Sequence, residues 1–148
     1  MKSCVFFGHR TVDSRIRSDI YAAIEDLIVK EDVFRFYVGH QGAFDAIVLS
    51  VLRELKKKHP QIDYAVVFAY LPKKDTLVTV EESLFPEEVA RAIPRFAIDA
   101  RNRFLIKNCD CAIVYVEVSY GGAFKFASLA KSKGKRVINL ARNDLLST

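Results

Sequence analysis

The chain has 148 residues, of which 51% are hydrophobic and 28% charged, and its formal net charge is +5. This length suits a single domain, 1–148, that is large enough to bury a substantial core. The apolar runs are short and interrupted by charge, which excludes a transmembrane helix. The first residues contain too short an apolar stretch for a signal peptide. We therefore expect a cytoplasmic protein with no membrane partner.

Cysteine and histidine spacing argues against a metal site. Cys4, Cys109 and Cys111 include no CxxC pair, which predicts buried thiols rather than a disulfide framework or a zinc centre.

Much of the positive charge lies in 56–58 and 131–136, at the ends of expected helices, where the helix dipole favours cations. The net charge is therefore compatible with an anionic ligand but does not identify one.

Five apolar runs rich in β-branched or aromatic residues predict β-strands. Several are continuously hydrophobic rather than alternating, which is typical of strands covered on both faces in a parallel sheet. In chain order the expected strands are 4–8, 34–39, 64–70, 111–118 and 136–140.

Apolar residues recur at helical spacing between these runs. Asp13 or Ser14 can cap the first expected helix, and Gly134 is placed as a C-cap glycine after the last one. The expected helices cover 16–28, 45–55, 97–108 and 122–134.

The alternation of strand and helix predicts an α/β fold, a three-layer α/β/α sandwich with a Rossmann-like, mainly parallel sheet. The doubly wound precedent gives the order 3-2-1-4-5 for its five strands. Residues 71–95 depart from the alternation, with three prolines and no sustained period. A connection of this length is uncommon in a compact domain. We expect an excursion over the carboxyl edge of the sheet, with a short helix near 86–92.

Glycines and polar residues follow three of the expected strands. In a doubly wound sheet, ligands bind beyond the carboxyl ends of the strands, near the point where the strand order reverses. We therefore expect these three turns to face one crevice and to supply its ligand-binding residues. They are Gly8, His9 and Arg10; Gly39, Gly42 and Asp45; and Gly121, Gly122 and Lys125.

The paired glycines at the last of these turns fit either a tight bend or a phosphate site. Gly121 and Gly122 permit positive φ and remove Cβ atoms, so that backbone N–H groups can approach an anion closely. The helix that begins there offers unpaired N–H donors and the positive end of its dipole. Arg10 adds a forked cation, and His9 a donor, an acceptor or a stacking face.

Three further residues leave two interpretations open. Arg101 has apolar neighbours at helical spacing and points inward to meet either a phosphate or a structural carboxylate. Asp45 either caps the second helix or accepts hydrogen bonds from a ribose hydroxyl or an amine. Glu117, placed near the carboxyl end of an apolar strand, is either a paired edge carboxylate or a polar group at the mouth of the crevice.

Four ordered motifs resemble the SLOG superfamily over nearly the full length: FFGHR, GHQGAFD, RNRFLIKNCD and YGGAFKFASLAKSKGKRVINL. This superfamily includes the Lonely Guy enzymes, the DNA-processing protein A family and the YpsA-type proteins, and the chain is most similar to small stand-alone YpsA-type members. The resemblance implies a Rossmann-like fold, a pocket for a nucleotide or nucleotide derivative at the strand ends, and a possible homo-oligomer. The positions that carry over are Gly8, His9, Arg10, Gly39, Gly42, Asp45, Arg101, Asn102, Gly121 and Gly122.

The chain departs from the motif of the Lonely Guy phosphoribohydrolases, PGGxGTxxE. Ala123, Phe124 and Lys125 follow the two glycines, and Ser128 stands where that motif has its glutamate. Without that carboxylate, cleavage of an N-glycosidic bond loses its electrostatic partner and its general acid/base. We therefore expect a binding or sensor protein for a nucleotide-derived phosphorylated small molecule, with no cofactor.

Two alternative functions follow from the same residues. The first is a phosphoribohydrolase that uses Asp45 or Glu117 as a substitute carboxylate. The second is a nucleic-acid binder, suggested by the sequence pI of about 9.2. The basic residues lie at helix ends and are not interleaved with aromatic residues as in a base-stacking surface, so the nucleic-acid interpretation ranks last.

Overall fold

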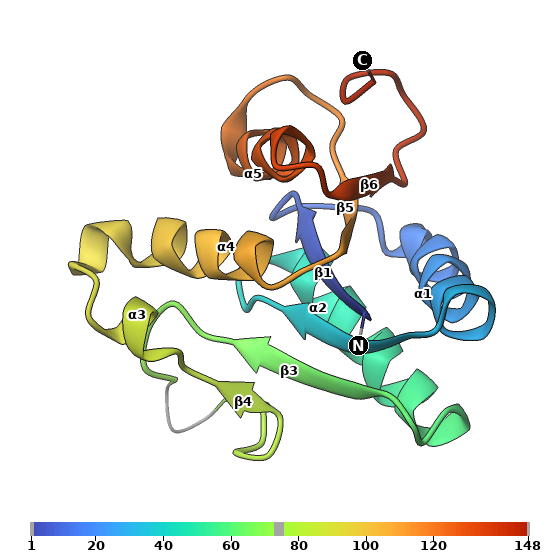
Figure 1. The fold of residues 1–148 in the computed structure, drawn as a ribbon, viewed down its shortest axis with the longest axis horizontal. Coiled ribbons are helices and arrows are strands. Elements are labelled where there is room, and N and C mark those ends of the chain that lie inside the picture. The colour runs from blue at the N-terminus through green and yellow to red at the C-terminus, as the bar shows by residue number, and fades with distance from the viewer. Residues whose placement is uncertain (1, 73–75, 148) are drawn as a thin grey trace.

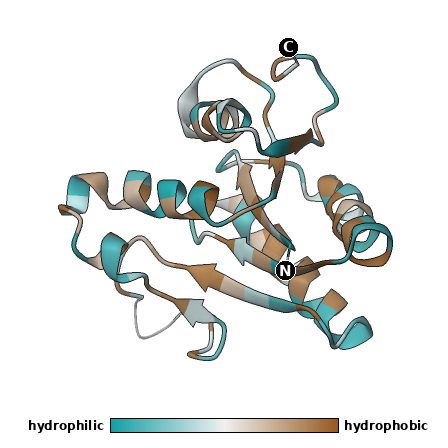
Figure 2. Cartoon of the chain, viewed as in Figure 1, coloured by the Kyte–Doolittle hydropathy of each residue, from teal (hydrophilic) through white to brown (hydrophobic). Residues whose placement is uncertain are grey.

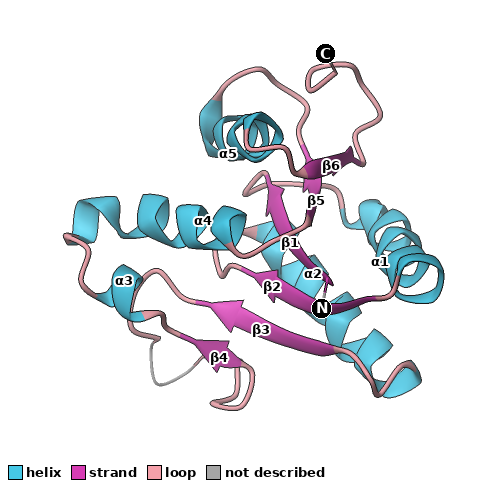
Figure 3. Ribbon diagram, viewed as in Figure 1, coloured by secondary structure: helices cyan, strands magenta, loops and turns pink. Residues whose placement is uncertain are grey.

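A single sheet of six strands forms the centre of the computed structural model, which describes residues 2–72 and 76–147. Every paired strand is parallel to its neighbour, and the order is β4-β3-β2-β1-β5-β6 (Figure 3). The strands are β1 (Lys2–Gly8), β2 (Val33–Val38), β3 (Asp63–Val67), β4 (Ser83–Leu84), β5 (Cys111–Tyr115) and β6 (Arg136–Asn139).

The five strands expected from the sequence lie in the predicted order 3-2-1-4-5, which confirms that prediction. β4 was not predicted and adds a sixth strand beside β3, at the edge of the sheet. A two-residue strand is too short to leave a hydrophobic pattern in the sequence, and it forms only because β3 offers it an unpaired edge.

Helices cover both faces of the sheet and complete the predicted three-layer α/β/α arrangement (Figure 1). The helices α1 and α2 pack on one face, and α4 and α5 pack on the other. In chain order they are α1 (Arg17–Glu31), α2 (Ala43–Lys58), α3 (Glu87–Ala90), α4 (Ala97–Lys107) and α5 (Gly121–Ser132), with short 3₁₀ turns at Ser14–Ile16 and Pro94–Phe96.

The strand β1 shows why its sequence is continuously apolar. Cys4 and Phe6 pack with α1 and α2, whereas Val5 and Phe7 pack with α4 and α5, so that both faces of the strand are buried. Figure 2 shows hydrophobic residues along the central strands and hydrophilic residues on the outer faces of the helices. The three cysteines are buried free thiols, as predicted.

Helix ends follow the sequence signals in part. The Asp13 carboxylate accepts a hydrogen bond from the Arg15 backbone N–H at 2.9 Å, and Gly134 follows α5 with φ +80°.

Within the ranges that the structure describes, no helix has the length and apolar character needed to cross a membrane.

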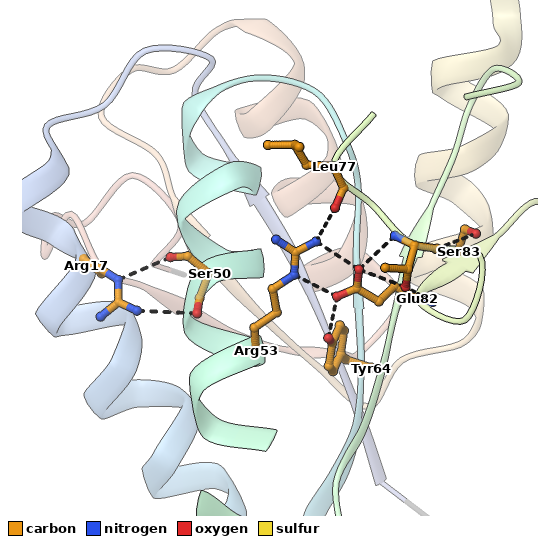
Figure 4. Close-up of polar contacts among 8 residues, drawn as sticks. Arg17, Ser50, Arg53, Tyr64, Leu77, Glu82 and Ser83 are labelled. Atoms are coloured by element: carbon orange, nitrogen blue, oxygen red, sulfur yellow. Dashed lines mark hydrogen bonds and ion pairs between the residues drawn. The ribbon is translucent and has the colours of Figure 1, made fainter. Parts of the chain in front are cut away.

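The long connection between β3 and α4 contains the expected short helix, α3. Instead of passing only over the carboxyl edge, this connection also extends the sheet, because Ser83 and Leu84 of β4 pair with Val66 and Val67 of β3. The connection is held to α2 by an ion pair, in which Arg53 donates to both carboxylate oxygens of Glu82, at 2.7 and 2.9 Å (Figure 4).

Additional hydrogen bonds make Glu82 the centre of this anchor. The Tyr64 hydroxyl donates to Glu82, and Arg53 also donates to the Leu77 carbonyl oxygen at 2.9 Å. The bonds from Arg53 lower the pKa of Glu82 to about 2. The Glu82 side chain is only 12% exposed, so solvent screens this pair less than a surface ion pair.

We expect Glu82→Gln to lower the free energy of unfolding by about 2 kcal/mol at pH 7. Because the folded-state pKa lies below the ordinary value of 4.5, the contribution is present above that value and is lost as the pH falls toward 2. Urea unfolding of both proteins across this range measures the difference. Glu87→Gln is the matched control, since Glu87 pairs with Arg91 on an exposed surface and should change stability by less than about 0.5 kcal/mol. A pH-independent difference for Glu82→Gln would contradict the prediction.

Candidate functional site

A cavity of about 310 Å³ lies where the turns after β1, β2 and β5 meet α4. The turns converge because β1 lies between β2 and β5, with the three strands parallel. Its lining residues are Phe6, Phe7, Gly8, His9, Arg10, Gly39, Gln41, Asp45, Ile98, Arg101, Asn102, Leu105, Gly122 and Ala123. Most of the positions singled out in the sequence therefore lie around one hollow at the carboxyl edge of the sheet.

The turns after β1 and β2 are joined backbone to backbone. The Ala43 N–H donates to the Arg10 carbonyl oxygen at 2.8 Å. Gly42 has φ +97°, and a Cβ at this position would lie 2.6 Å from the Arg10 Cα. Glycine is required here by both the positive φ and the close approach, and Gly42 itself lies outside the cavity lining.

Gly8 and Gly39 make room for side chains of the protein itself. A Cβ at Gly8 would overlap the ring of Phe44. A Cβ at Gly39 would lie 2.5 Å from Nη1 of Arg101 and 2.9 Å from Oδ2 of Asp45. These two glycines allow the floor of the cavity to pack closely, which the sequence alone did not distinguish from space left for a ligand.

The paired glycines before α5 face open space. No heavy atom lies within 4 Å of a Cβ added at Gly121 or Gly122. Gly121 has φ +86° and makes the bend, whereas Gly122 lines the cavity. The N-cap residue of α5, Tyr120, makes no side-chain capping bond, and the first turn holds no acidic residue. The amino end of α5 at the cavity is thus uncapped by side chains.

Arg101 is a buried cation in the cavity wall, with only 3% of its surface exposed. Its Nε donates to Oδ1 of Asn102 at 2.7 Å, and its Nη1 donates to the Val67 carbonyl oxygen at 3.2 Å. Its Nη2 has no hydrogen-bond partner among residues 2–72 and 76–147. Burial lowers the pKa of Arg101, and the charge of Asp45 opposes that shift.

Asp45 lies in the first turn of α2 but is not the N-cap, which is Gly42. The interpretation of Asp45 as the N-cap of this helix is therefore wrong. The helix begins at Ala43, two residues before Asp45, whereas the apolar spacing in the sequence placed its start at Asp45. The Oδ2 atom of Asp45 instead accepts a hydrogen bond from the Gln41 backbone N–H at 2.9 Å. Burial raises the pKa of Asp45 to about 6, while Arg101 and the Gln41 N–H act in the opposite direction.

We expect the stability of the wild type to fall, relative to Asp45→Asn, by about 2 to 3 kcal/mol as the pH rises from 4 to 7. The folded-state pKa of Asp45 is raised, so the folded protein keeps a proton that the unfolded chain has already released in this range. Above about pH 7, where Asp45 is ionised in both the folded and the unfolded states, the difference should stay constant. Denaturant unfolding of both proteins at several pH values measures it. Parallel stability curves would contradict the raised pKa.

His9 connects two of the turns. Its Nε2 accepts a hydrogen bond from the Glu117 backbone N–H at 2.9 Å, and its ring meets Tyr115 edge to face with centroids 6.3 Å apart.

The expectation that Glu117 lies inside a strand is wrong, because β5 ends at Tyr115. The Glu117 side chain is exposed and lies outside the cavity lining. The apolar run continues past the last residue that pairs with a neighbouring strand.

Two predicted cations are placed differently. Arg10 is exposed and lines the cavity. Lys125 lies outside the lining and donates to Oδ1 of Asp99 on α4 at 3.1 Å.

Four other residues line the cavity but were not singled out in the sequence: Gln41, Ile98, Leu105 and Ala123. Of these four residues, only Gln41 could have been found from the sequence, because it lies between Gly39 and Gly42.

The fold and this cavity define a Rossmann-like α/β domain with two guanidinium groups and one buried carboxyl group at the carboxyl edge of its sheet. Across the described part of the chain, no group of three or more His, Cys, Asp or Glu side chains is placed to hold a metal ion. No protein-family model matches the chain, and no curated protein sequence is significantly similar to it.

Proposed function

We propose that this protein binds a nucleotide or a nucleotide-derived phosphorylated small molecule in the cavity, as a binding or sensor module of the SLOG type. One observation carries the proposal. The cavity brings Arg10 and the buried Arg101 to the same hollow as Gly122 at the uncapped amino end of α5. A phosphoryl group suits this arrangement, because guanidinium groups and helix N–H donors both bind its oxygens.

The uneven use of the Arg101 donors supports an anionic ligand. Two of its nitrogens are occupied by Asn102 and Val67, which hold the guanidinium in a fixed orientation. Nη2 makes no hydrogen bond within residues 2–72 and 76–147, so it can donate to a ligand. A phosphoryl or ribose oxygen in the cavity would supply the partner for Nη2. The Asn102 side chain, which is also in the lining, would add its amide donors.

Calorimetric titration with ribose 5-phosphate, nucleoside monophosphates and ADP-ribose tests the proposal. We expect at least one to bind, and Arg10→Ala to weaken the binding by about tenfold, because Arg10 contributes a charge-assisted hydrogen bond. The control is Arg15→Ala, which removes an exposed arginine from the same loop region, where it pairs with Asp13 outside the cavity. Failure of every compound to bind, or unchanged binding by Arg10→Ala, would count against the proposal.

A second candidate function is phosphoribohydrolase activity, which the raised pKa of Asp45 favours. A buried carboxyl group with a pKa of about 6 beside the cavity is suited to general acid or base catalysis near neutral pH. Glu117, the other carboxylate considered, lies outside the lining. Incubation of wild type and Asp45→Asn with nucleoside monophosphates, followed by assay for ribose 5-phosphate, decides between binding and hydrolysis. Release by the wild type and none by the variant would support the enzyme.

A further inference from the structure

A second cavity, of about 380 Å³, lies where the carboxyl-terminal ends of α4 and α5 meet. These helix ends lead into β5 and β6, so the cavity lies toward the amino edge of the sheet, whereas the candidate functional site lies at the carboxyl edge. The two cavities share no lining residue. The second cavity is therefore separate from the proposed ligand site.

Cations surround an apolar base in this second cavity. Its lining residues are Arg103, Ile106, Lys107, Leu129, Lys133 and Lys135. Ile106 is buried and Leu129 is half-buried, and both belong to the core beneath the two helices. The side chains of Arg103, Lys107 and Lys133 are exposed. An apolar centre inside a polar rim is the usual arrangement of a protein–protein interface.

The lysines around this cavity are not balanced by acids as those at the end of α2 are. At the end of α2, two of three consecutive lysines form ion pairs, at 3.7 and 2.8 Å. Around the cavity, Arg103 pairs with Asp99, but the three lysines form no ion pair within 2–72 and 76–147. The helix dipole favours cations at all these ends, so it does not account for the difference.

The two helical layers of the fold also differ in charge. Residues 17–58, which contain α1 and α2, hold seven basic and seven acidic side chains, counting arginine and lysine as basic. Residues 97–136, which contain α4 and α5, hold eight basic and three acidic side chains. The excess positive charge therefore lies on the side of the sheet that carries the second cavity. A one-sided field of this kind attracts an acidic partner and speeds its association.

We propose that the second cavity is a docking site for an acidic peptide segment of a partner protein. An apolar side chain of that segment enters between Ile106 and Leu129, and flanking carboxylates pair with Lys107 and Lys133. The apolar anchor supplies affinity, and the charged rim supplies specificity and association rate. This docking site is independent of the proposed function.

A nucleic acid fits the second cavity less well than an acidic peptide does. Its phosphates would pair with the cations of the rim but would leave the apolar base without a partner. The described lining residues include no aromatic ring on which a base could stack. The peptide satisfies both the base and the rim of the cavity, and it is the occupant that the lining favours.

Fluorescence anisotropy with two fluorescein-labelled peptides tests the proposal. One peptide carries Leu-Phe flanked on each side by two glutamates, and the other carries Ser-Ser in place of Leu-Phe, so that the pair differs in the apolar anchor and not in charge. We expect the wild type to bind the Leu-Phe peptide at least about tenfold more tightly, because burial of an apolar side chain is worth a factor of that order. Leu129→Ser should remove this gain.

The double variant Lys107→Glu/Lys133→Glu should bind the Leu-Phe peptide about tenfold or more weakly, because two attractive charges of the rim become repulsive. The matched control is Lys30→Glu/Lys57→Glu, which changes the net charge equally. These two lysines are exposed in the last turns of α1 and α2, on the opposite face. In about 0.1 M salt, charges that far from the cavity are screened, so the control should bind as the wild type does.

Three results would overturn the proposal. The first is no binding of the Leu-Phe peptide, or equal affinity for the two peptides. The second is an equal loss of affinity in the two double variants, which would mean that the peptide responds to net charge and not to the cavity. The third is tighter binding of a labelled DNA duplex than of the Leu-Phe peptide, lost in Lys107→Glu/Lys133→Glu, which would make this face a nucleic-acid surface.

Discussion

Replacing Gly8 with alanine should lower the free energy of unfolding by about 3 kcal/mol, because the added methyl group has no space. A Cβ at this position would lie only 2.6 Å from Cδ1 of Phe44 and closer still to other ring carbons. Phe44 is fully buried at the start of α2, and Gly8 ends a strand that is paired on both sides. Neither the ring nor the strand can move without disturbing the core.

Thermal unfolding followed by circular dichroism measures this effect, and we expect Tm to fall by roughly 6 to 12 °C. Gly122→Ala is the control, because a Cβ there meets no atom within 4 Å, and its stability should change by less than about 0.5 kcal/mol. Phe44→Leu should partly relieve the clash, so that Gly8→Ala destabilises the Phe44→Leu protein less than the wild type. An unchanged Tm for Gly8→Ala would show that the turn after β1 yields where we expect it to be rigid.

Replacing Arg101 with methionine should weaken the binding of ribose 5-phosphate by about 100-fold or more. The guanidinium combines a full charge with an available Nη2 donor at the cavity wall, and each hydrogen bond to a charged group contributes about 1.5 to 3 kcal/mol. Nη2 carries two N–H groups, and two such bonds from it to a phosphoryl group correspond to at least this loss of affinity. Calorimetric titration at constant ionic strength measures it, since phosphate binding depends on salt.

Arg103→Met is the matched control for this effect. Arg103 lies on the same helix but is exposed and pairs with Asp99 outside the cavity lining, so the variant should bind ribose 5-phosphate as the wild type does. Arg101→Lys keeps the charge but loses the forked geometry and should show an intermediate loss. If Arg101→Met does not fold, Arg101→Lys still tests the prediction, because lysine keeps a cation near Asp45. Wild-type affinity in both Arg101 variants would exclude Arg101 from the binding site.

The candidate site was partly visible in the sequence. Arg10, Asp45 and Gly122 were singled out because turns after parallel strands meet at one edge of a sheet. Arg101 was singled out because of its apolar neighbours at helical spacing, and all four residues line the cavity. Lys125 was included because of its position after the glycines, but it faces Asp99 on α4. The direction of a helical side chain depends on how neighbouring helices pack, and local spacing carries no information about that packing.

The roles of the glycines show the same limit. Gly8, Gly39 and Gly122 looked equivalent in the sequence, since each follows a strand or begins a helix. In the structure a Cβ at Gly8 would strike Phe44, one at Gly39 would strike Arg101, and one at Gly122 would meet only open space. Which glycine leaves room for a ligand depends on atoms distant in the chain, so no local pattern could distinguish them.

The sequence by itself determined the α/β class, the five main strands and their order, because hydrophobic periodicity and the rules of parallel connection depend on local pattern and chain direction. Tertiary structure alone decided the edge strand β4, the raised pKa of Asp45 and the ion pair between Arg53 and Glu82. Each of these arises from groups far apart in the chain that approach only when the sheet and helices pack, and burial and contact between such groups leave no trace in local spacing.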